Sequence, residues 1–341
     1  MAEYYAGLDV SMSTTYIWLE DYRGKKVKEC EVKTSIEDIS LALLDWQGGA
    51  QLVMESGPLS SWLCKGLRGV GFDTICADAR HLAALLSSRT NKNDRNDSRG
   101  IAQMARAGLI REVEVKSDEA QEIQMLLGSR NHLVGAIRTM SNTIRGLLKA
   151  EGIRFSGPLS AKKLIEKTNE TLAKLSHGMN ASIQPLLRAL EALSRELLEL
   201  DKLARKKSSE DPRCRLLMTA PSVGPIVSLT YVSTIDRAER FEDARSVGAY
   251  LGCTPKQYAS GEVDRHGRMS RCGPAECRYM LFEAAMVLLT ACKKPSKLRT
   301  WGLKLAKKKG MRKACGAVAR KLSVILHRML ITNTEFQYQG V

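Results

Sequence analysis

A heptad repeat of apolar residues in the middle of the chain constrains the fold more than any other feature. From Ile183 to Ala204, apolar residues recur at alternating steps of three and four, which places them on one stripe of a long helix. The surrounding stretch, residues 118–208, has helical periodicity with an interruption near residues 152–157. We expect a helical coiled-coil region that forms an antiparallel hairpin, a dimer interface or both, with an ordinary bundle helix within one chain as the alternative. The repeat consists of Ile183, Leu186, Leu190, Leu193, Leu197, Leu200 and Ala204.

The first hundred residues alternate between strand patterns and helix patterns. Short segments rich in apolar, aromatic and β-branched residues are separated by turns and by amphipathic stretches. This order predicts a mixed sheet with helices on its faces, and Gly108 is placed to end the last helix. Strands are expected at residues 4–10, 14–20, 27–33, 51–55 and 72–77, and helices at 35–46, 58–67 and 94–107.

The last third of the chain is expected to be mostly α-helical. A polar, proline-terminated segment at residues 206–212 predicts a domain boundary. Helices are expected at residues 274–291 and 313–330, and a loop rich in Gly, Ser and Arg is expected at 254–273. A length of 341 residues fits two or three domains. We therefore expect three domains, an N-terminal domain at residues 1–112, a helical domain at 113–210 and a C-terminal domain at 211–341.

The distribution of charge favours a polyanionic partner for the last third of the chain. The whole chain has 53 Lys and Arg against 37 Asp and Glu, a net charge of +16. Residues 1–100 are close to neutral, whereas residues 211–341 carry 23 basic and 10 acidic side chains. Nucleic acid is the commonest large polyanion, so we expect the basic region to bind DNA or RNA. The alternative is a basic surface that only keeps the protein soluble.

The sequence disfavours a membrane location and a secreted location. No apolar run approaches the roughly 18 residues that a membrane span needs, and the first residues lack the pattern of a signal peptide. The nine cysteines show no framework spacing, which favours reduced thiols. We therefore expect a cytoplasmic protein with no membrane partner.

Four acidic residues stand where predicted strands end or a predicted helix begins. Asp9 and Glu55 close strands, and Asp94 and Asp97 lie one turn apart at the start of the helix 94–107. Both helix carboxylates fall on its apolar face, so we expect them to point toward the sheet and to need a cation between them. Oxygen ligands select Mg²⁺ or Mn²⁺, and four carboxylates can hold two such ions about 4 Å apart. The alternative is that Asp94 caps the helix and Asp97 pairs with an arginine.

The motifs that contain these acids resemble a known family. The segments GLDVS, VMESGP and KNDRND, in this order and at this spacing, resemble the RuvC-like DEDD transposases of bacterial insertion sequences, a family that includes the Piv and MooV DNA invertases. The resemblance implies an α/β RNase H-like (RuvC-like) fold for the N-terminal domain. It also implies that Asp9, Glu55, Asp94 and Asp97 form a catalytic, metal-binding tetrad.

The resemblance continues through the C-terminal region. TAPSVGPIVSLTYVSTI matches a family segment, except that Ser222 stands where glycine is usual. Its PSVGP turn is similar to a phosphate-binding turn between helices, and a simple turn is the alternative. In a second matching segment the resemblance implies that Ser260, in YASGE, is the nucleophile that becomes linked to DNA, whereas the residues alone indicate only a turn. Nucleic-acid contacts are expected from Arg265, Arg268, Arg271, Lys307, Lys308 and Lys309.

These features together predict a DNA transposase or site-specific recombinase that cleaves and rejoins strands, using a Mg²⁺-binding DEDD site together with a serine nucleophile. The resemblance implies guidance by a structured, element-encoded non-coding RNA (bridge RNA) that pairs with donor and target double-stranded DNA. Exchange between two duplexes implies a homodimer or homotetramer, associated with the nucleoid when bound to DNA. The alternatives are a Mg²⁺-dependent junction-resolving endonuclease, which needs no Ser260, and a non-catalytic nucleic-acid-binding protein.

Overall fold

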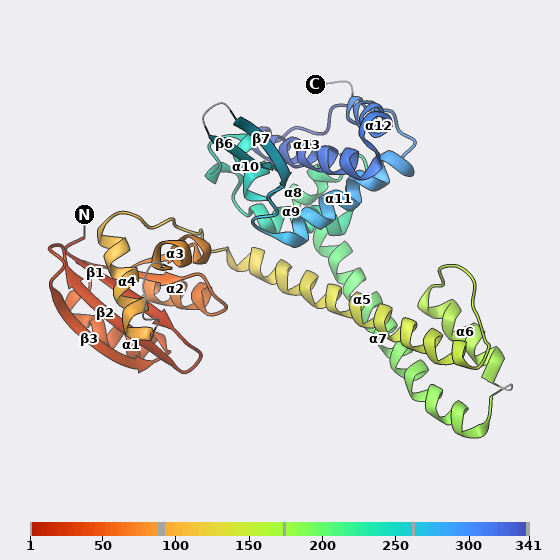
Figure 1. The fold of residues 1–341 in the computed structure, drawn as a ribbon, viewed down its shortest axis with the longest axis horizontal. Coiled ribbons are helices and arrows are strands. Elements are labelled where there is room, and N and C mark those ends of the chain that lie inside the picture. Colours follow the sequence, from red (N-terminus) through yellow and green to blue (C-terminus); the bar gives the residue numbers. More distant parts are fainter. Residues whose placement is uncertain (1, 88–92, 173–174, 261–262, 339–341) are drawn as a thin grey trace. The chain divides into compact units, whose positions relative to one another are not determined.

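The computed structural model describes residues 2–87, 93–172, 175–260 and 263–338. By their contacts these residues form two compact units, Met1–Lys116 and Ser117–Val341, and each unit is described by itself (Figure 1). In the described part of the chain, no helix combines the length and apolar character that crossing a membrane requires.

The first unit is built on one mixed five-stranded sheet, as the sequence predicts. The strand order is β3-β2-β1-β4-β5, with β1 antiparallel to β2 and parallel to β4. All five predicted strands are present to within about two residues, because apolar and β-branched residues mark each of them. The strands are β1 (Tyr4–Val10), β2 (Thr14–Asp21), β3 (Lys26–Lys33), β4 (Ala50–Glu55) and β5 (Asp73–Ala77).

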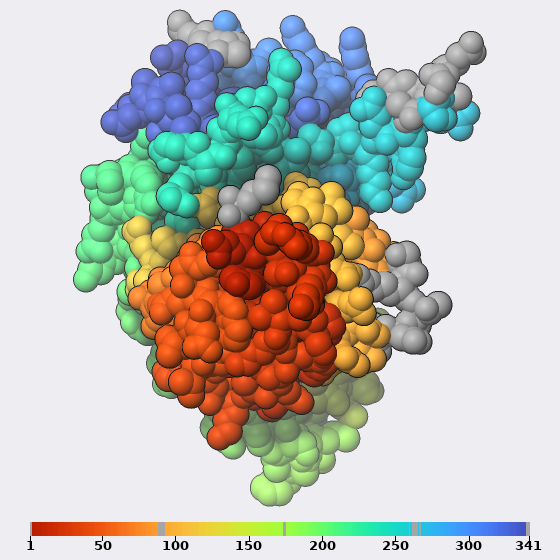
Figure 2. All heavy atoms as spheres, turned by 90° about the vertical axis from the view of Figure 1, so that its left-hand side faces the viewer, coloured from red at the N-terminus to blue at the C-terminus, as the bar shows by residue number. Residues whose placement is uncertain are grey.

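Different helices cover the two faces of this sheet. Leu8 of β1 packs in one cluster with Ile39 and Leu63, which belong to α1 and α2. On the opposite face Tyr5 packs in another cluster with Leu82 and Ile101, which belong to α3 and α4. In the space-filling view the atoms of this unit, red to orange, form one continuous packed surface (Figure 2). The helices are α1 (Ile36–Leu43), η1 (Leu44–Trp46), α2 (Ser60–Gly69), α3 (Ala79–Leu86) and α4 (Asp94–Arg106).

Helix α4 lies directly against β1 at Gly7. A Cβ atom added at Gly7 would stand 1.9 Å from the carbonyl oxygen of Ser98 and 2.6 Å from the amide nitrogen of Ala102. Both of these are backbone atoms of α4, so no side-chain movement can make room. Glycine at this position is therefore what allows the helix backbone to touch the strand.

Two ion pairs tie α4 to the antiparallel side of the sheet. Near its start, Nε of Arg95 lies 2.6 Å from Oε1 of Glu29 on β3, and near its end Nε of Arg106 lies 2.8 Å from Oε1 of Glu20 on β2. The Glu20 side chain is 1% exposed and that of Glu29 is 17% exposed, so both carboxylates are largely withdrawn from water. Partly buried charges of this kind are costly unless paired, so each pair holds the helix in register with the strands.

The carboxylate of Glu29 accepts further hydrogen bonds. The Tyr16 hydroxyl donates to it, and the Lys26 ammonium lies 3.0 Å away. The Tyr16 hydrogen bond, followed by those of Lys26 and Arg95, lowers the pKa of Glu29 to about 2. The same hydrogen bond raises the pKa of Tyr16 to about 12, since ionisation of the phenol would place two negative charges together.

The second unit begins with two long antiparallel helices, α5 (Asp118–Ala150) and α7 (His177–Glu210), joined through α6 (Ala161–Thr171). Arg130 pairs with Asp201 at 2.6 Å, which joins the first half of α5 to the last half of α7. Of the heptad positions, Ile183, Leu190 and Ala204 are buried, and the coiled-coil description stays a prediction. Helix α7 ends at Glu210 and the next helix begins at Pro212, and the domain boundary expected at residues 206–212 stays a prediction.

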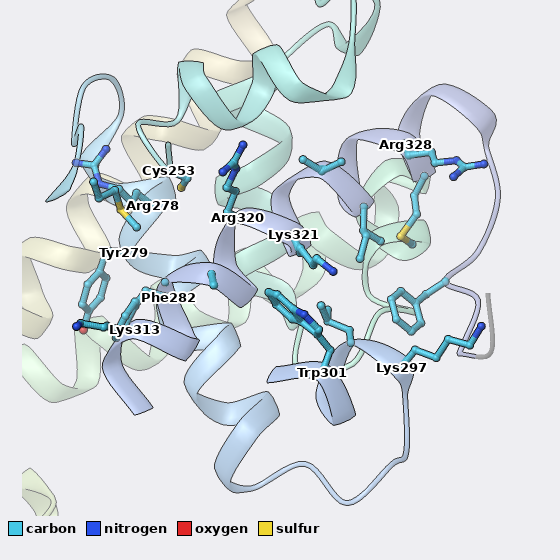
Figure 3. A pocket seen from close by; sticks show the side chains of 18 of the residues that line it. Cys253, Arg278, Tyr279, Phe282, Lys297, Trp301, Lys313, Arg320, Lys321 and Arg328 are labelled. Carbon is cyan, nitrogen blue, oxygen red and sulfur yellow. The ribbon is translucent and has the colours of Figure 1, made fainter. Parts of the chain in front are cut away.

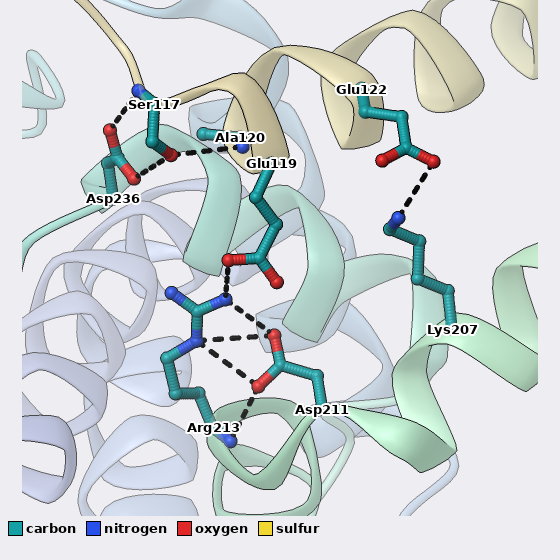
Figure 4. A network of polar contacts seen from close by, with 8 residues as sticks. All are labelled: Ser117, Glu119, Ala120, Glu122, Lys207, Asp211, Arg213 and Asp236. Atoms are coloured by element: carbon teal, nitrogen blue, oxygen red, sulfur yellow. Dashed lines mark hydrogen bonds and ion pairs between the residues drawn. The ribbon is translucent and has the colours of Figure 1, made fainter.

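A polar network fixes the start of this hairpin to the helices that follow it (Figure 4). The amide and hydroxyl of Ser117 donate to Asp236 at 2.8 and 2.7 Å. The guanidinium of Arg213 joins Glu119 of α5 to Asp211, which caps α8 (Pro212–Leu217). These contacts explain why the hairpin and the rest of the C-terminal region form one unit.

The remaining helices surround an apolar core that includes the fully buried Tyr231. The loop expected at residues 254–273 is wrong, because this segment contains a β-hairpin, and its polar residues lack the apolar alternation that usually marks strands. Between the two helices expected from the sequence lies a further helix, α12, whose Leu298, Trp301 and Leu305 pack on the core. The elements are α9 (Pro225–Ile235), η3 (Ala238–Arg240), α10 (Ala244–Tyr250), β6 (Pro255–Ser260), β7 (Val263–Met269), α11 (Ala275–Thr290), α12 (Lys297–Lys309) and α13 (Met311–Thr332).

The contact at Gly7 predicts the effect of adding one methyl group. Gly7→Ala should lower the free energy of unfolding by about 1–3 kcal/mol, because the new Cβ forces α4 away from β1. Gly69→Ala is the matched control, since nothing lies within 4 Å of a Cβ at that position. Urea unfolding of both variants measures the difference. Equal midpoints for the two variants would show that α4 does not rest on β1 as described.

The Glu29 cluster predicts a pH dependence. Because the folded pKa of about 2 lies below the ordinary 4.5, the contribution of Glu29 to stability is present above pH 4.5 and is lost as the pH falls toward 2. Glu29→Gln should therefore be less stable at pH 7 and lose less stability between pH 4.5 and 2. The control Glu37→Gln removes an exposed charge from α1. Urea unfolding across this pH range tests the point, and parallel curves for wild type and Glu29→Gln would refute it.

Candidate active site

Asp9 and Glu55 occupy neighbouring positions at one end of the sheet. β1 and β4 are parallel neighbours whose register pairs Leu8 with Met54, so Asp9 and Glu55 are the next residues on the two strands. Side chains alternate along a strand, which places Asp9 on the same face as Tyr5, and Glu55 on the same face as Val53. Tyr5 and Val53 both belong to the cluster under α4. The two carboxylates therefore share the α4 face of the sheet.

The direction of α4 brings its first turn toward the same end. Ile101 and Ala105 pack in a cluster with Tyr5, while the Ser98 carbonyl lies against Gly7, two residues further along β1. The helix thus runs antiparallel to β1, and the residues before Ser98 extend toward Asp9. Asp94 and Asp97 lie in this first turn.

The two helix carboxylates differ in their surroundings. Asp97 is half-buried, whereas Asp94 is exposed, so the expectation that both point toward the sheet is wrong for Asp94. The reason is that α4 meets β1 from Ser98 onward, and Asp94 lies a full turn before this contact. The alternative that Asp94 caps the helix is also wrong, because the side chain of Asn93 accepts the hydrogen bond from the amide of Asn96 at 2.8 Å.

The four acids supply only oxygen donors, which is the ligand type of Mg²⁺ and Mn²⁺. Within the described ranges, no three His, Cys, Asp or Glu side chains stand close enough together to hold a metal ion. The fold thus brings the acid-bearing segments to one face and one end of the sheet, without closing them into a coordination set. The donor chemistry fits a hard divalent cation.

Ser260 ends β6 in the second unit and is exposed. It pairs with Val263 across the hairpin, and Gly261 and Glu262 between them lie outside the described residues. Ser260 itself lies in a strand, and Gly261 of the turn predicted from the Ser-Gly dipeptide lies outside the described residues. The side chain of Tyr258, two residues earlier, is 60% exposed.

The predicted nucleic-acid residues fall into two places. Arg268 and Arg271 line a cavity of about 2040 Å³ in the second unit, to which α11, α12, α13 and the hairpin contribute (Figure 3). Arg265 is exposed on β7, opposite Tyr258. The last turn of α12, with exposed basic residues, is a separate site; its residues are Lys307, Lys308 and Lys309.

The cavity also contains basic residues that sequence reasoning did not single out. They come from α11, α12 and α13, and the excess of basic over acidic residues in this region is the signal that could have found them. The residues that were missed are Arg278, Lys297, Arg312, Lys313, Arg320, Lys321 and Arg328.

The PSVGP turn connects α8 to α9 and holds Ser222 at φ +67°. This left-handed conformation favours glycine, which explains why serine is an unusual residue here. The Ser222 hydroxyl is buried and has no hydrogen-bond partner among the described atoms. Gly224 caps α9 and Pro225 occupies its first turn, so the segment forms a tight turn between helices.

Comparison with known proteins gives consistent matches in both units. Residues 6–152 match a DEDD transposase family of IS110-type elements, and residues 214–300 match the transposase IS116/IS110/IS902 family. The chain is 29% identical to the transposase for insertion sequence element IS1111A of Coxiella burnetii, over 95% of this chain and 88% of that protein. It is 27% identical to a probable family 20 transposase of Pseudomonas aeruginosa, over 72% of this chain and 73% of the other. The matched segments include the four acids and Ser260, and the chain belongs to the IS116/IS110/IS902 family of transposases.

Proposed function

We propose that this transposase cleaves and rejoins DNA strands with two sets of groups, a divalent-metal site formed by Asp9, Glu55, Asp94 and Asp97, and a nucleophile, Ser260. The observation that supports the metal site most directly is the contact of α4 with Gly7. It brings the acid-bearing turn of α4 to the face and end of the sheet where Asp9 and Glu55 stand.

In this proposal, Mg²⁺ or Mn²⁺ bound by the four carboxylates would supply positive charge to a reacting phosphodiester. The four carboxylates would hold that charge, Asp94 and Asp97 from α4 and Asp9 and Glu55 from the ends of β1 and β4. The Arg95–Glu29 and Arg106–Glu20 pairs keep α4 aligned with the strands.

The serine would act by transesterification. The Oγ atom of Ser260 forms a bond to phosphorus and gives up its proton, and the bond from phosphorus to one deoxyribose oxygen breaks, with that oxygen taking up a proton. One phosphodiester is exchanged for another, so rejoining needs no external energy source. The exposure of Ser260 on a hairpin is compatible with access to a DNA backbone.

Binding is assigned to the basic surface of the second unit, with Arg265, Arg268 and Arg271 near the hairpin and the basic turn at Lys307–309 contacting phosphates. Double-stranded donor and target DNA are the proposed substrates, and a structured non-coding RNA encoded by the element is the proposed guide. A homodimer or homotetramer would provide the sites for exchanging strands of two duplexes. We place this activity in the cytoplasm, at the nucleoid.

Asp97→Asn tests the metal site. The change removes one negative ligand while leaving the basic surface intact, so strand cleavage should fall by at least about 100-fold and DNA binding should change by less than about twofold. Asp45→Asn, an exposed acid of η1, is the control of equal charge. Gel assays of nicked product and of bound DNA give both readouts. Normal cleavage by Asp97→Asn would eliminate Asp97 as a ligand.

Ser260→Ala tests the nucleophile. Loss of the hydroxyl should abolish strand exchange and the covalent intermediate, yet leave metal and DNA binding unchanged, because shape and charge are almost conserved. Mass spectrometry of denatured reactions should find DNA attached to the peptide that contains Ser260. Tyr258→Phe is the control, because Tyr258 is the exposed hydroxyl two residues away. An adduct on Tyr258, or full activity of Ser260→Ala, would contradict the serine mechanism.

A further inference from the structure

The cavity of about 2040 Å³ in the second unit has a composition unlike that of the rest of the chain (Figure 3). Nine of its lining residues are Lys or Arg, and Glu335 is the one acid among the described residues that line it. Five of the 29 described residues that line it are aromatic, whereas aromatic residues make up 5% of the whole chain. Positive charge and aromatic rings are therefore concentrated in one concave surface, which we call the α13 groove.

Helix α13 forms one side of the α13 groove with a regular pattern. Lys313, Arg320 and Arg328 are exposed and follow one another at steps of seven and eight residues, which keeps them on one side of the helix. They span about 22 Å at ~1.5 Å per residue. Half-buried small and apolar residues, among them Ala317 and Val324, lie between them. The helix thus offers an apolar strip with cations along it.

The charges of the α13 groove are not balanced within the protein. Within the described ranges, Lys313, Arg320 and Arg328 make no ion pair. By contrast, cations of the α5–α7 hairpin such as Arg130 and Lys207 pair with acids of the opposite helix. Like charges gathered in a concave surface repel one another, and a bound polyanion removes that cost.

The aromatic residues distinguish among polyanions. Tyr279 of α11 is 53% exposed and lines the α13 groove, and Trp301 of α12 lies under the ammonium of Lys321, 3.9 Å from its ring centroid. A duplex presents phosphates outward and keeps its bases stacked inside, so it leaves such rings unused. A single strand presents both phosphates and base faces, and proteins bind it with basic grooves that contain aromatic platforms.

We propose that the α13 groove binds single-stranded nucleic acid, with phosphates on Lys313, Arg320 and Arg328 and bases against the apolar strip and Tyr279. The proposal rests on the proposed function, since strand exchange passes through unpaired segments. It adds to the proposed function a binding site, the α13 groove, and a ligand class, single-stranded nucleic acid, and the residues that bind it are separate from the four acids and Ser260.

The test compares two triple variants of the full chain. The groove variant replaces Lys313, Arg320 and Arg328 by Ala. The control variant replaces three exposed cations of α7 by Ala, namely Arg195, Lys202 and Lys206. Fluorescence anisotropy with labelled oligo(dT) should show at least about tenfold weaker binding for the first variant. The slope of log affinity against log salt should be smaller by about 2, because ~0.7 counterion is released per phosphate contact. The control should stay within about twofold of wild type.

Tyr279 provides the matched test of stacking. Tyr279→Ala should weaken oligo(dT) binding at least about fivefold, whereas Tyr279→Phe should retain it, because every base has a face that stacks on a ring. Binding of a duplex of equal length should be unchanged by Tyr279→Ala. Circular dichroism confirms that each variant is folded, which is expected because these side chains lie outside the core.

The outcomes separate this proposal from the proposed function. Binding is measured in EDTA and repeated with Asp97→Asn, so it depends on neither metal nor cleavage. Equal losses in the two triple variants, an unaffected Tyr279→Ala, or a groove variant that loses duplex binding but keeps oligo(dT) binding would overturn the single-strand site. Intact oligo(dT) binding together with normal cleavage by Asp97→Asn would instead refute the metal site and leave the α13 groove standing.

Discussion

The contact between the backbone of α4 and Gly7 is the constraint on which the first unit depends. Side chains normally separate a helix from a sheet, but here the Ser98 carbonyl occupies the space that a Cβ atom of Gly7 would need. This contact sets the height, direction and register of α4 over β1. The positions of Asp94 and Asp97 relative to Asp9 and Glu55 depend on it.

The charged residues of α4 then divide into two roles. Arg95 pairs with Glu29, and Arg106 pairs with Glu20, both on the antiparallel strands. These two ion pairs oppose rotation of α4 about its own axis at the Gly7 contact. The guanidinium of Arg99 lies over the ring of buried Trp18, 5.2 Å from its centroid, and adds a third attachment. The arginines of α4 thus attach the helix to the sheet, while Asp94 and Asp97 lie in its first turn, toward the end of the sheet. The second unit shows a different balance, since its cations exceed its acids and gather around the α13 groove.

Much of the first unit could be predicted from the sequence because its signals are local. Ser35 caps α1, Gly108 ends the α4 segment at φ +68°, and each strand carries its own apolar pattern. The β6–β7 hairpin could not be predicted in this way, because PKQYAS and VDRHGRM lack the apolar alternation of a half-buried strand. Helix α12 could not be predicted in this way either, because its many lysines obscure the helical pattern of its apolar residues, although Ser296 caps it.

For the candidate sites, the sequence proposes residues but does not place them. The four acids and Ser260 stand in recognisable motifs, so they could be proposed as site residues before any fold was known. The exposure of Asp94 could not be predicted from the sequence, since it depends on where α4 first contacts β1. The α13 groove could not be predicted from the sequence either. Arg268 and Arg328, which both line it, are sixty residues apart in the chain, and only tertiary packing brings them to one surface.

If α4 holds Asp94 and Asp97 near the sheet end that carries Asp9 and Glu55, the proposed metal site can form from these four acids. Anomalous diffraction from crystals of the full chain soaked in Mn²⁺ detects a metal ion at this place. We expect an anomalous peak within about 2.5 Å of carboxylate oxygens of Asp9 and of at least one of the other three acids. A saturating Mn²⁺ soak that leaves this sheet end empty, or a peak bound only by other residues, would contradict the proposed metal site.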